Sequence, residues 1–559
     1  MPSTPATVFH RDVALEQLTS EEFDVLVIGG GITGAGVLLD AASRGLKAAL
    51  VERDDFASGT SSKSSKLVHG GLRYLQQREF ALVHENLVER HRLLHNAPHL
   101  VEPLAFLIPL FGKGGVVDQT VVRAFSAALW MYDVGGGWRI GKRHRKISAD
   151  ELAAHLPTLR QDRLVAGFLY YDARTDDARL TLAIVRTAVL SFGAVACNHA
   201  RVVSLVHDAS GQVRGARLEP EGGASPIEVK ARAVVNATGV WADEVRALEP
   251  GNEGGTLRPA KGIHLTVSRE KLPCDVAAVI PVPKDKRSIF IVPWGEHTYL
   301  GTTDTDYDGS LDDPRVDERD VEYVLRAING VVTHSITAED VTGSWAGLRP
   351  LLAHAPGRSR APSARTADLS RRHQVTTSPT GLVTITGGKL TTYRKMAEDA
   401  VGALSPVLGH LRPAATRRLR LRGAEGLESA EALATAIGSS DADVAAHLRA
   451  RYGSEARAVL GLVSEQSELA RPLVAGLPYL GAEVVFAVRY EMARTVEDVL
   501  ARRTRALLLD ATAALEAAPR VADLMAAELG WEESQRDEAV AAFAAVVATQ
   551  RPLHSEAAT

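Results

Sequence analysis

Hydrophobic and polar positions follow two different patterns along this chain. Near its start, residues 23–28 and 46–51 form continuous apolar runs with the length and β-branched content of buried parallel strands. Residues 35–44 between them are mostly small or aliphatic and predict a helix, which Gly45 can end in a left-handed conformation. Strand, helix and strand in this order predict a βαβ unit of an α/β domain.

Residues 258–350 show the second pattern, in which apolar and polar positions alternate. The alternation over 263–267, 288–293 and 298–302 predicts antiparallel strands, the last two joined across Gly295. We expect these strands to form a substrate-binding sheet. From about residue 405 onward the chain is rich in Ala, Leu, Glu and Arg, which predicts a mostly helical terminal domain.

A glycine-rich turn joins the first predicted strand to the first predicted helix. Gly29, Gly31 and Gly34 occupy the glycine places of the G-x-G-x-x-G pattern, which serve a tight turn, close approach of a pyrophosphate and close helix–strand packing. Glu52 follows the second strand, where a carboxylate can accept hydrogen bonds from an adenosine ribose. The complete order of strand, turn, helix, strand and acid favours a dinucleotide site over a coincidental glycine turn.

Three later segments also place small residues beside a strand or helix. The hydroxyl-rich stretch 58–66 is either a solvated loop or, directly after the dinucleotide unit, a cofactor-contacting loop. Gly70 and Gly71 allow close approach of a flat ring. The strand end at 233–239 and the glycines before Thr391 predict further backbone that faces the same nucleotide, since open α/β sheets bind ligands at their carboxyl edge.

Composition and charge narrow the class of protein. With 559 residues, 45% hydrophobic and 24% charged, the chain is long enough for about three or four domain-sized units of a globular protein. The formal net charge of −4 argues against bulk nucleic-acid binding. Cys197 and Cys274 lack disulfide-scaffold or zinc-ligand spacing, so we expect no metal site and a reducing compartment. The first twenty residues lack the apolar core of a signal peptide, and no apolar run reaches about 18 residues, which predicts a cytoplasmic protein that does not span a membrane.

With these motifs in place, the chain resembles the FAD-dependent, respiratory glycerol-3-phosphate dehydrogenases, which pass electrons to membrane quinone. The matching motifs run in order from residue 23 to about residue 510, and the serine-to-tyrosine and Gly-Gly-Lys stretches are specific to that family. The motifs are residues 29–34, 64–75, 176–180, 236–239, 301–304, 387–395 and 494–505. No D-x-D-x-D-G loop follows residue 405, so the calcium control of the mitochondrial relatives is not implied.

The resemblance implies an α/β fold with three kinds of domain: an FAD-binding Rossmann-like domain of the glucose-oxidoreductase/D-amino-acid-oxidase-like type, an antiparallel substrate-binding sheet and a C-terminal helical domain. The expected divisions of the chain are an N-terminal arm at 1–22, FAD-binding parts at 23–103, 161–245 and 376–404, an apolar and basic insertion at 104–160, a substrate-binding part at 246–375 and the helical domain at 405–559.

The resemblance also implies FAD as the cofactor, held without a covalent bond; attachment through His69 is the alternative. The residues expected to contact FAD are Gly29, Gly31, Gly34, Glu52, Thr60, Ser61, Ser65, His69, Gly70, Gly71, Val202, Ala237, Gly239, Asp304, Gly388, Lys389, Leu390 and Thr391.

The implied reaction is oxidation of sn-glycerol 3-phosphate to dihydroxyacetone phosphate, with hydride passing from C2 to the flavin. Because the substrate phosphate carries a charge of about −1.5 to −2, its pocket needs cations. Arg73, Arg349 and Lys389 lie on glycine-flanked turns and can supply them, with Tyr74 as a hydroxyl donor; the alternative is ordinary surface charges. His264 is the expected base for the C2 hydroxyl proton, since imidazole titrates near neutral pH, and Arg349 competes for orienting that hydroxyl. Lys389 can also stabilise the charge of the reduced flavin.

Three other functions stay open. A glycerol-3-phosphate oxidase that uses O₂ and produces H₂O₂ shares nearly every motif. A flavin amine oxidase acting on an amino acid is disfavoured by the several cations, and a flavin-binding sensor without turnover is disfavoured by the intact set of polar site residues.

Residues 104–146 combine apolar residues with a basic run, a composition that suits an element lying on anionic lipid. The apolar residues are Phe106, Leu107, Ile108, Leu110, Phe111, Leu129, Trp130 and Met131, and the cations are Arg139, Lys142, Arg143, Arg145 and Lys146. We therefore predict peripheral association with the inner face of the cell membrane, where quinone is met. The alternative is a subdomain core with a solvated basic loop. The oligomeric state is open, with a homodimer among the alternatives.

Overall fold

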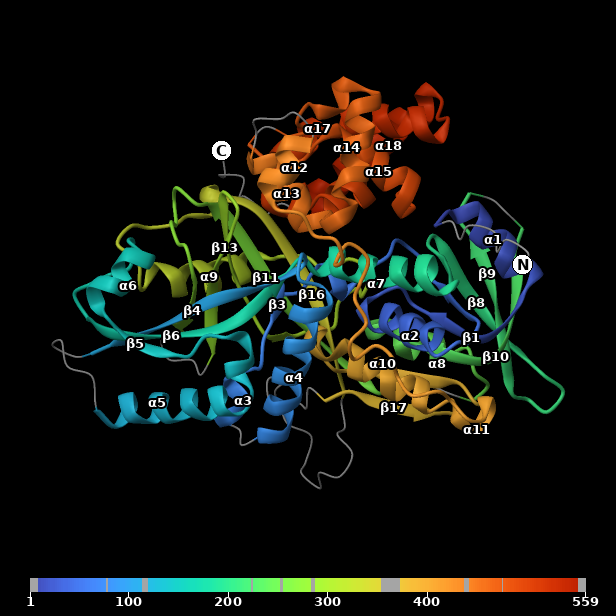
Figure 1. Ribbon diagram of the computed structural model, residues 1–559, viewed down its shortest axis with the longest axis horizontal. Coiled ribbons are helices and arrows are strands. Elements are labelled where there is room, and N and C mark those ends of the chain that lie inside the picture. Colours follow the sequence, from blue (N-terminus) through green and yellow to red (C-terminus); the bar gives the residue numbers. More distant parts are fainter. Residues whose placement is uncertain are drawn as a thin grey trace.

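Two sheets and a group of helices make up the structure, a computed structural model that describes residues 9–76, 79–112, 119–222, 225–251, 255–282, 287–352, 372–436, 442–474 and 476–550. Figure 1 shows the first sheet with its helices at the right, the second sheet at the left and the C-terminal helices above both.

The first sheet has a parallel centre. Its described strands run in the order β17-β18-β10-β1-β2-β7, and the antiparallel pair β8–β9 joins it through β10. The strands are β1 (Glu22–Ile28), β2 (Ala48–Val51), β7 (Val195–Cys197), β8 (Ala200–His207), β9 (Val213–Pro220), β10 (Ile227–Asn236), β17 (Gln374–Thr377) and β18 (Val383–Thr386). The associated helices are α2 (Ile32–Ser43), α7 (Asp177–Phe192), α8 (Ala242–Arg246), α10 (Tyr393–Gly402) and α11 (Ser405–Leu408).

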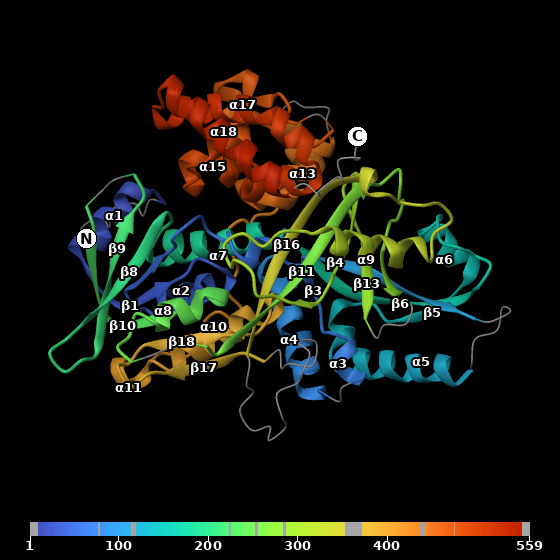
Figure 2. The ribbon, with the colours of Figure 1, turned by 180° about the vertical axis from the view of Figure 1, so that it is seen from behind.

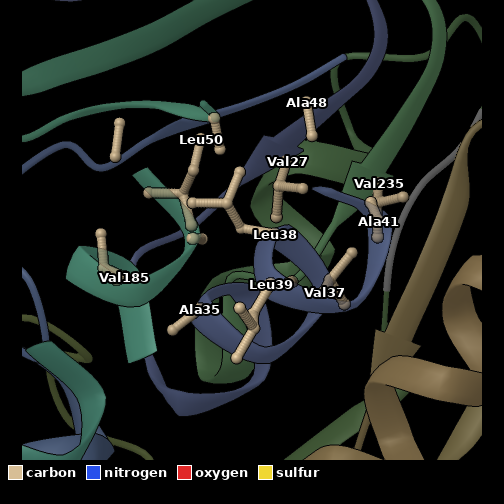
Figure 3. Close-up of a cluster of buried hydrophobic side chains, with 14 of the residues drawn as sticks. Val27, Ala35, Val37, Leu38, Leu39, Ala41, Ala48, Leu50, Val185 and Val235 are labelled. Carbon is tan, nitrogen blue, oxygen red and sulfur yellow. The ribbon is translucent and has the colours of Figure 1, made fainter. Parts of the chain in front are cut away.

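Helix α2 packs into the apolar centre of this domain. Figure 3 shows Leu38 of α2 beside Val27 of β1 and Leu50 of β2, all fully buried. The predicted βαβ unit is therefore confirmed, although α2 begins at Ile32 and β2 at Ala48. Gly45, with φ +88°, has the left-handed conformation expected of it.

The N-terminal segment, predicted as an arm at 1–22, contains a packed helix in its described part. Residues 11–20 form α1 (Arg11–Ser20), in which Ala14 and Leu18 are buried. Arg11 donates hydrogen bonds to the carbonyls of Asn198 and His199 at 3.2 and 2.9 Å. These contacts join the described part of the segment to the first domain, a relationship over almost 190 residues of sequence that local composition does not reveal.

The second sheet is mostly antiparallel. Its described strands run in the order β15-β11-β14-β13-β12-β4-β6-β3, with β16 paired to β11 and β5 to β6. They are β3 (Leu67–Val68), β4 (Val101–Phe111), β5 (Arg145–Ser148), β6 (Leu164–Thr175), β11 (Leu257–Ser268), β12 (Ala277–Pro281), β13 (Ser288–Trp294), β14 (His297–Gly301), β15 (Thr305–Asp306) and β16 (Val341–Leu352). The associated helices are α3 (Arg73–Gln76), α4 (Phe80–Asn96), α5 (Gln119–Val134), α6 (Ala149–His155) and α9 (Glu318–Asn329). The predicted hairpin across Gly295 is confirmed as β13–β14.

Strand β4 corrects the predicted insertion at 104–160. It pairs along its length with β6 and in parallel with β12, and Phe106, Leu107 and Leu110 are buried. Strand β6, which we had placed in the FAD-binding part at 161–245, likewise belongs to the second sheet. The apolar run is therefore sheet core and not a lipid-facing surface.

The C-terminal helical domain contacts the first domain through buried ion pairs. Its described helices are α12 (Ala430–Ala436), α13 (Ala442–Tyr452), α14 (Ala456–Glu465), α15 (Gly481–Glu491), α16 (Ala506–Leu509), α17 (Ala511–Leu529) and α18 (Glu533–Gln550). Figure 2 shows from behind that they cover the two sheet domains from one side. Arg503 binds both oxygens of Asp55 at 2.6 and 2.9 Å, and Arg179 of α7 binds Glu491. Partnered in this way, the buried charges fix how the domains sit together.

Candidate active site

A cavity of about 380 Å³ lies along the carboxyl edge of the first sheet. Gly29 after β1, Glu52 after β2 and Ala237 after β10 all line it. Parallel strands present their carboxyl ends at one edge, which explains why residues more than 180 positions apart meet here.

The glycines of the first turn allow backbone to pack on backbone. A Cβ on Gly34 would lie 1.9 Å from the carbonyl oxygen of Gly29, so any side chain there would push α2 away from β1. Gly29 itself has φ +107°, and a Cβ on it would lie 2.8 Å from the carbonyl oxygen of Ala237. The turn thus places the start of α2 directly at the cavity.

Glu52 is a buried carboxylate held by backbone. It accepts the N–H of Gly30 at 2.6 Å and the N–H of Asp54 at 2.9 Å. Burial raises the pKa of this carboxyl to about 7, and the two hydrogen bonds only partly oppose that rise. Hydroxyl donors from a ligand would favour the ionised form, which is the role expected of a ribose-binding acid.

A tryptophan that the sequence analysis did not single out closes one side of the cavity. The guanidinium of Arg53 lies 4.4 Å from the ring centroid of Trp241, and the indole N–H donates to Asp312 at 2.8 Å. A Cβ on Gly59 would lie 2.8 Å from the same ring. No periodic pattern around Trp241 marks it, because its partners come from two distant segments, at residues 53–59 and at residue 312.

At one end of the cavity the first domain meets the second sheet. Ser64 lines the cavity, and the hydroxyl of the next residue, Ser65, lies 2.9 Å from Nε2 of His264 on β11. The His264 ring stacks on Trp345 of β16, with centroids 4.8 Å apart. His264 is not among the residues that line the cavity; its fixed imidazole contacts Ser65, the residue that follows the lining residue Ser64.

The electrostatic surroundings of His264 favour the neutral ring. Burial is the largest cause, and the nearby charges of Lys66 and Arg349 add to it, so that the pKa of His264 lies well below its ordinary value. The imidazole is therefore uncharged at neutral pH.

Glycines in β11 and β16 separate His264 from Arg349. His264 pairs with Trp345, Gly262 with Gly347 and Ala260 with Arg349. Alternate residues of a strand share a face, so His264 and Arg349 lie on one face with two glycines between them. A Cβ on Gly262 would lie 2.4 Å from the Arg349 guanidinium, and that guanidinium also binds Asp304 at 3.0 Å.

Lys389 approaches from the first domain. It lines the cavity, and its ammonium lies 3.8 Å from the ring centroid of Tyr74, a residue of α3. The structure thus places Lys389 next to Tyr74, and both were predicted to belong to the phosphate pocket. The side chain of Arg73 lies outside the described part of the chain.

Gly70 packs against a buried tyrosine and an aspartate of the second sheet domain. Its N–H donates to the hydroxyl of Tyr132 at 2.9 Å and to Asp172 at 3.1 Å, and a Cβ would lie 2.5 Å from the Tyr132 oxygen. Gly70 therefore makes room for a buried tyrosine of α5. His69 and Thr391 lie side by side, with the His69 N–H donating to the threonine hydroxyl at 3.3 Å.

The predicted cofactor residues fall into two groups. Those that line the cavity are Gly29, Gly31, Glu52, Thr60, Ser61, Val202, Ala237, Gly239, Gly388, Lys389 and Leu390. Those outside its lining are Gly34, Ser65, His69, Gly70, Gly71, Asp304 and Thr391. In the second group, Ser65 lies at His264 and Asp304 at Arg349.

Comparison with known proteins shows the family to which the chain belongs. Residues 24–394 match the family described as FAD dependent oxidoreductase, and residues 414–536 match the C-terminal domain of alpha-glycerophosphate oxidase. The glycerol-3-phosphate dehydrogenase of Mycobacterium leprae (strain TN) is 41% identical over 545 residues, covering 96% of this chain and 90% of the relative. The mitochondrial glycerol-3-phosphate dehydrogenase of Homo sapiens is 36% identical over 540 residues, covering 93% of this chain and 72% of the relative.

Among solved structures, the glycerol-3-phosphate dehydrogenase from Bacillus halodurans complexed with FAD is similar with a TM-score of 0.79 and 33% identity, covering 97% of this chain and 98% of that one. The two-sheet fold is thus that of the FAD-dependent oxidoreductases. Within that class, the chain belongs to the glycerol-3-phosphate dehydrogenase family.

Proposed function

We propose that this protein binds FAD without a covalent bond and oxidises sn-glycerol 3-phosphate to dihydroxyacetone phosphate. The observation that carries the proposal is the continuity between cavity and base: Ser64 lines the cavity, and Ser65 contacts His264. Relatives named glycerol-3-phosphate dehydrogenase at about 40% identity support the same reaction.

The cavity has the chemistry that FAD requires. Backbone at Gly29 and Gly31, next to the start of α2, suits the pyrophosphate. Glu52 suits the adenosine ribose, and apolar side chains such as Val202 and Leu248 suit the adenine ring. The Gly388 turn, with φ +79° before Lys389, suits the flavin end.

Each residue of the proposed catalytic group has a separate task. When bound, FAD supplies the acceptor for the hydride that leaves C2. His264, neutral for the reasons given above, takes the proton of the C2 hydroxyl, and Arg349 orients that hydroxyl. Lys389 and Arg73 bind the phosphate, and Tyr74, under the Lys389 ammonium, adds a hydroxyl donor.

The electron acceptor separates two candidate functions. We propose membrane quinone as the acceptor, while the match to the C-terminal domain of alpha-glycerophosphate oxidase favours an oxidase as the second candidate. A steady-state assay with glycerol 3-phosphate should compare a quinone analogue with oxygen and score peroxide. Fast turnover with the quinone analogue and little peroxide supports the dehydrogenase. Stoichiometric peroxide supports the oxidase, and no turnover with either acceptor contradicts both.

We further propose that the protein contacts anionic lipid at the inner face of the cell membrane through α5. The apolar run in β4 is buried and cannot contact lipid, whereas α5 leaves Trp130, Met131 and Val134 exposed. The exposed cations Lys142 and Arg143 follow α5 in the sequence. Aromatic and aliphatic side chains beside a basic cluster suit an interfacial helix. Among the described helices, none has both the length and the apolar content to cross a membrane.

A further inference from the structure

A buried carboxylate from α7 holds the turn that carries Ser65. Asp177 is fully buried, and its Oδ2 accepts the backbone N–H and the hydroxyl of Ser64 at 3.0 and 2.7 Å. The hydroxyl oxygen of Ser64 in turn accepts the backbone N–H of Lys66 at 2.9 Å. These bonds define the turn at residues 64–66, whose middle residue contacts His264.

The C-terminal helical domain reaches the same carboxylate. Arg505, with no exposed surface, donates from Nη2 to Oδ1 of Asp177 at 3.0 Å and to the carbonyl of Ser62. Lys66 Nζ donates to the same two groups, at 3.2 Å to the carboxylate and 3.1 Å to the carbonyl. One cation of the turn and one of the helical domain therefore share their acceptors.

The turn depends on these acceptors because its own conformation is unfavourable. Lys66 has φ +56°, the left-handed region that costs a side chain free energy. Burial and the charge of Arg505 lower the pKa of the Lys66 ammonium to about 8, against the opposing effect of Asp177. Hydrogen bonds from outside the turn are thus what keep it in place.

The residues after Arg505 also contact the two strands of the site. The carbonyl of Leu508 accepts the hydroxyl of Thr266, two residues after His264 on β11, at 2.7 Å. Gly343 lies two residues before Trp345 on β16. A Cβ on Gly343 would lie 2.2 Å from the carbonyl oxygen of Leu508. The segment at 505–509 therefore touches the turn and both strands that hold the imidazole.

We propose that Arg505 and Asp177 are positioning residues: through the turn at residues 64–66 they orient His264, so that the C-terminal helical domain takes part in catalysis. This inference rests on the proposed role of His264 in oxidation of glycerol 3-phosphate.

The first test uses two variants of neighbouring arginines. Arg505→Lys keeps the charge but removes the planar guanidinium, whose Nη2 donates to both Asp177 and Ser62 while its Nη1 donates to the carbonyl of Ala501. Arg503→Lys is the matched control, because Arg503 is equally buried but binds Asp55 instead of the turn. In anaerobic rapid mixing of FAD-saturated proteins with glycerol 3-phosphate, Arg505→Lys should reduce its flavin about tenfold more slowly than the control, with KM changed less than about twofold. Equal reduction rates in the two variants overturn the proposal.

A second variant covers the case in which Arg505→Lys fails to fold. Ser64→Ala removes only the hydroxyl between Asp177 and the Lys66 N–H, and it should slow flavin reduction by a similar factor. Where both singles fold, the double variant should be no slower than the slower single, because both substitutions act through one turn. Parent-rate reduction in Ser64→Ala, or losses that multiply in the double variant, contradict the positioning role. A parent protein whose flavin glycerol 3-phosphate does not reduce refutes the proposed function and this inference together, whereas a reactive parent with an unaffected Arg505→Lys refutes the positioning role alone.

Discussion

The imidazole of His264 stacks on the indole of Trp345, with centroids 4.8 Å apart and planes 13° from parallel. Since Ser65 also contacts Nε2 of this ring, both the plane of the ring and its rotation are fixed. Burial, with the charges of Lys66 and Arg349, keeps the ring neutral. The neutral ring holds a lone pair that can accept a proton without reorganisation of the ring, but burial and the two nearby cations make it a weaker base than an imidazole in water.

Binding of FAD should strengthen as pH rises through about 7. In the folded protein without FAD, the pKa of Glu52 is raised to about 7. The protonated carboxyl therefore stabilises the FAD-free fold at low pH, and this stabilisation is lost as the pH rises through about 7. Ribose hydroxyls that donate to the carboxylate favour its ionised form. The dissociation constant of FAD, measured by fluorescence titration of the apoprotein, should therefore fall between about pH 5.5 and 8. Glu52→Gln should flatten this dependence; an unchanged pH profile would show that the carboxylate does not contact the cofactor.

Lys389→Ala should raise the KM for glycerol 3-phosphate by about one to two decades, the cost of a lost charge-assisted hydrogen bond. Arg73→Ala should act in the same direction. Oxidation of glycerol, which has no phosphate, should hardly change in either variant. Lys395→Ala is the control, because Lys395 pairs with Asp399 on α10. If Lys389→Ala impairs glycerol and glycerol 3-phosphate equally, Lys389 does not bind the phosphate.

Gly34→Ala should abolish FAD binding and sharply lower the melting temperature, because its Cβ would collide with the Gly29 carbonyl at 1.9 Å. Gly461→Ala is a matched control in helix α14, where a Cβ meets nothing within 4 Å. It should stabilise the protein by about 0.5–1 kcal/mol, since alanine loses less conformational freedom in a helix. Calorimetry and flavin content report both effects. A yellow, stable Gly34→Ala protein would contradict the packing role.

Replacing Trp130, Met131 and Val134 together by Ser should reduce sedimentation with acidic vesicles at both low and high salt. Each exposed apolar side chain that inserts contributes up to about 1.5–3 kcal/mol, independently of salt. A variant with Lys142 and Arg143 changed to Glu should lose binding mainly at low salt, because the charge attraction is already screened at high salt. Phe192→Ser, at an exposed position of α7, serves as the control. Vesicle binding equal to that of the parent in the triple variant would exclude α5 as the contact.

The sequence predicts those features of the fold that depend on residues close together along the chain. The βαβ unit, the β13–β14 hairpin and the left-handed Gly45 follow from periodicity and turn chemistry within a few positions. The position of β4 cannot be predicted in this way. The burial of Phe106 depends on pairing with β6, some 60 residues later, and with β12. An apolar strand core and an apolar lipid-binding stretch have the same composition, and only the pairing distinguishes them.

The candidate site shows the same division. Glycines and Glu52 could be predicted because each has a local pattern around it. Trp345 could not, since a single aromatic residue in an alternating strand is most often ordinary core. The link from Arg505 to Asp177 spans 328 positions and exists only once the domains have packed together.

The most direct test of the whole account is anaerobic rapid mixing of the FAD-bound protein with sn-glycerol 3-phosphate. The flavin absorbance of the parent protein should bleach in a single substrate-dependent phase. His264→Ala, with equal FAD content, should bleach about 10²–10⁴-fold more slowly. His155→Ala, whose imidazole pairs with Asp275 at the surface, should behave as the parent. A parent flavin that stays oxidised contradicts the proposed reaction, and a His264→Ala flavin that bleaches at the parent rate contradicts the assignment of the base.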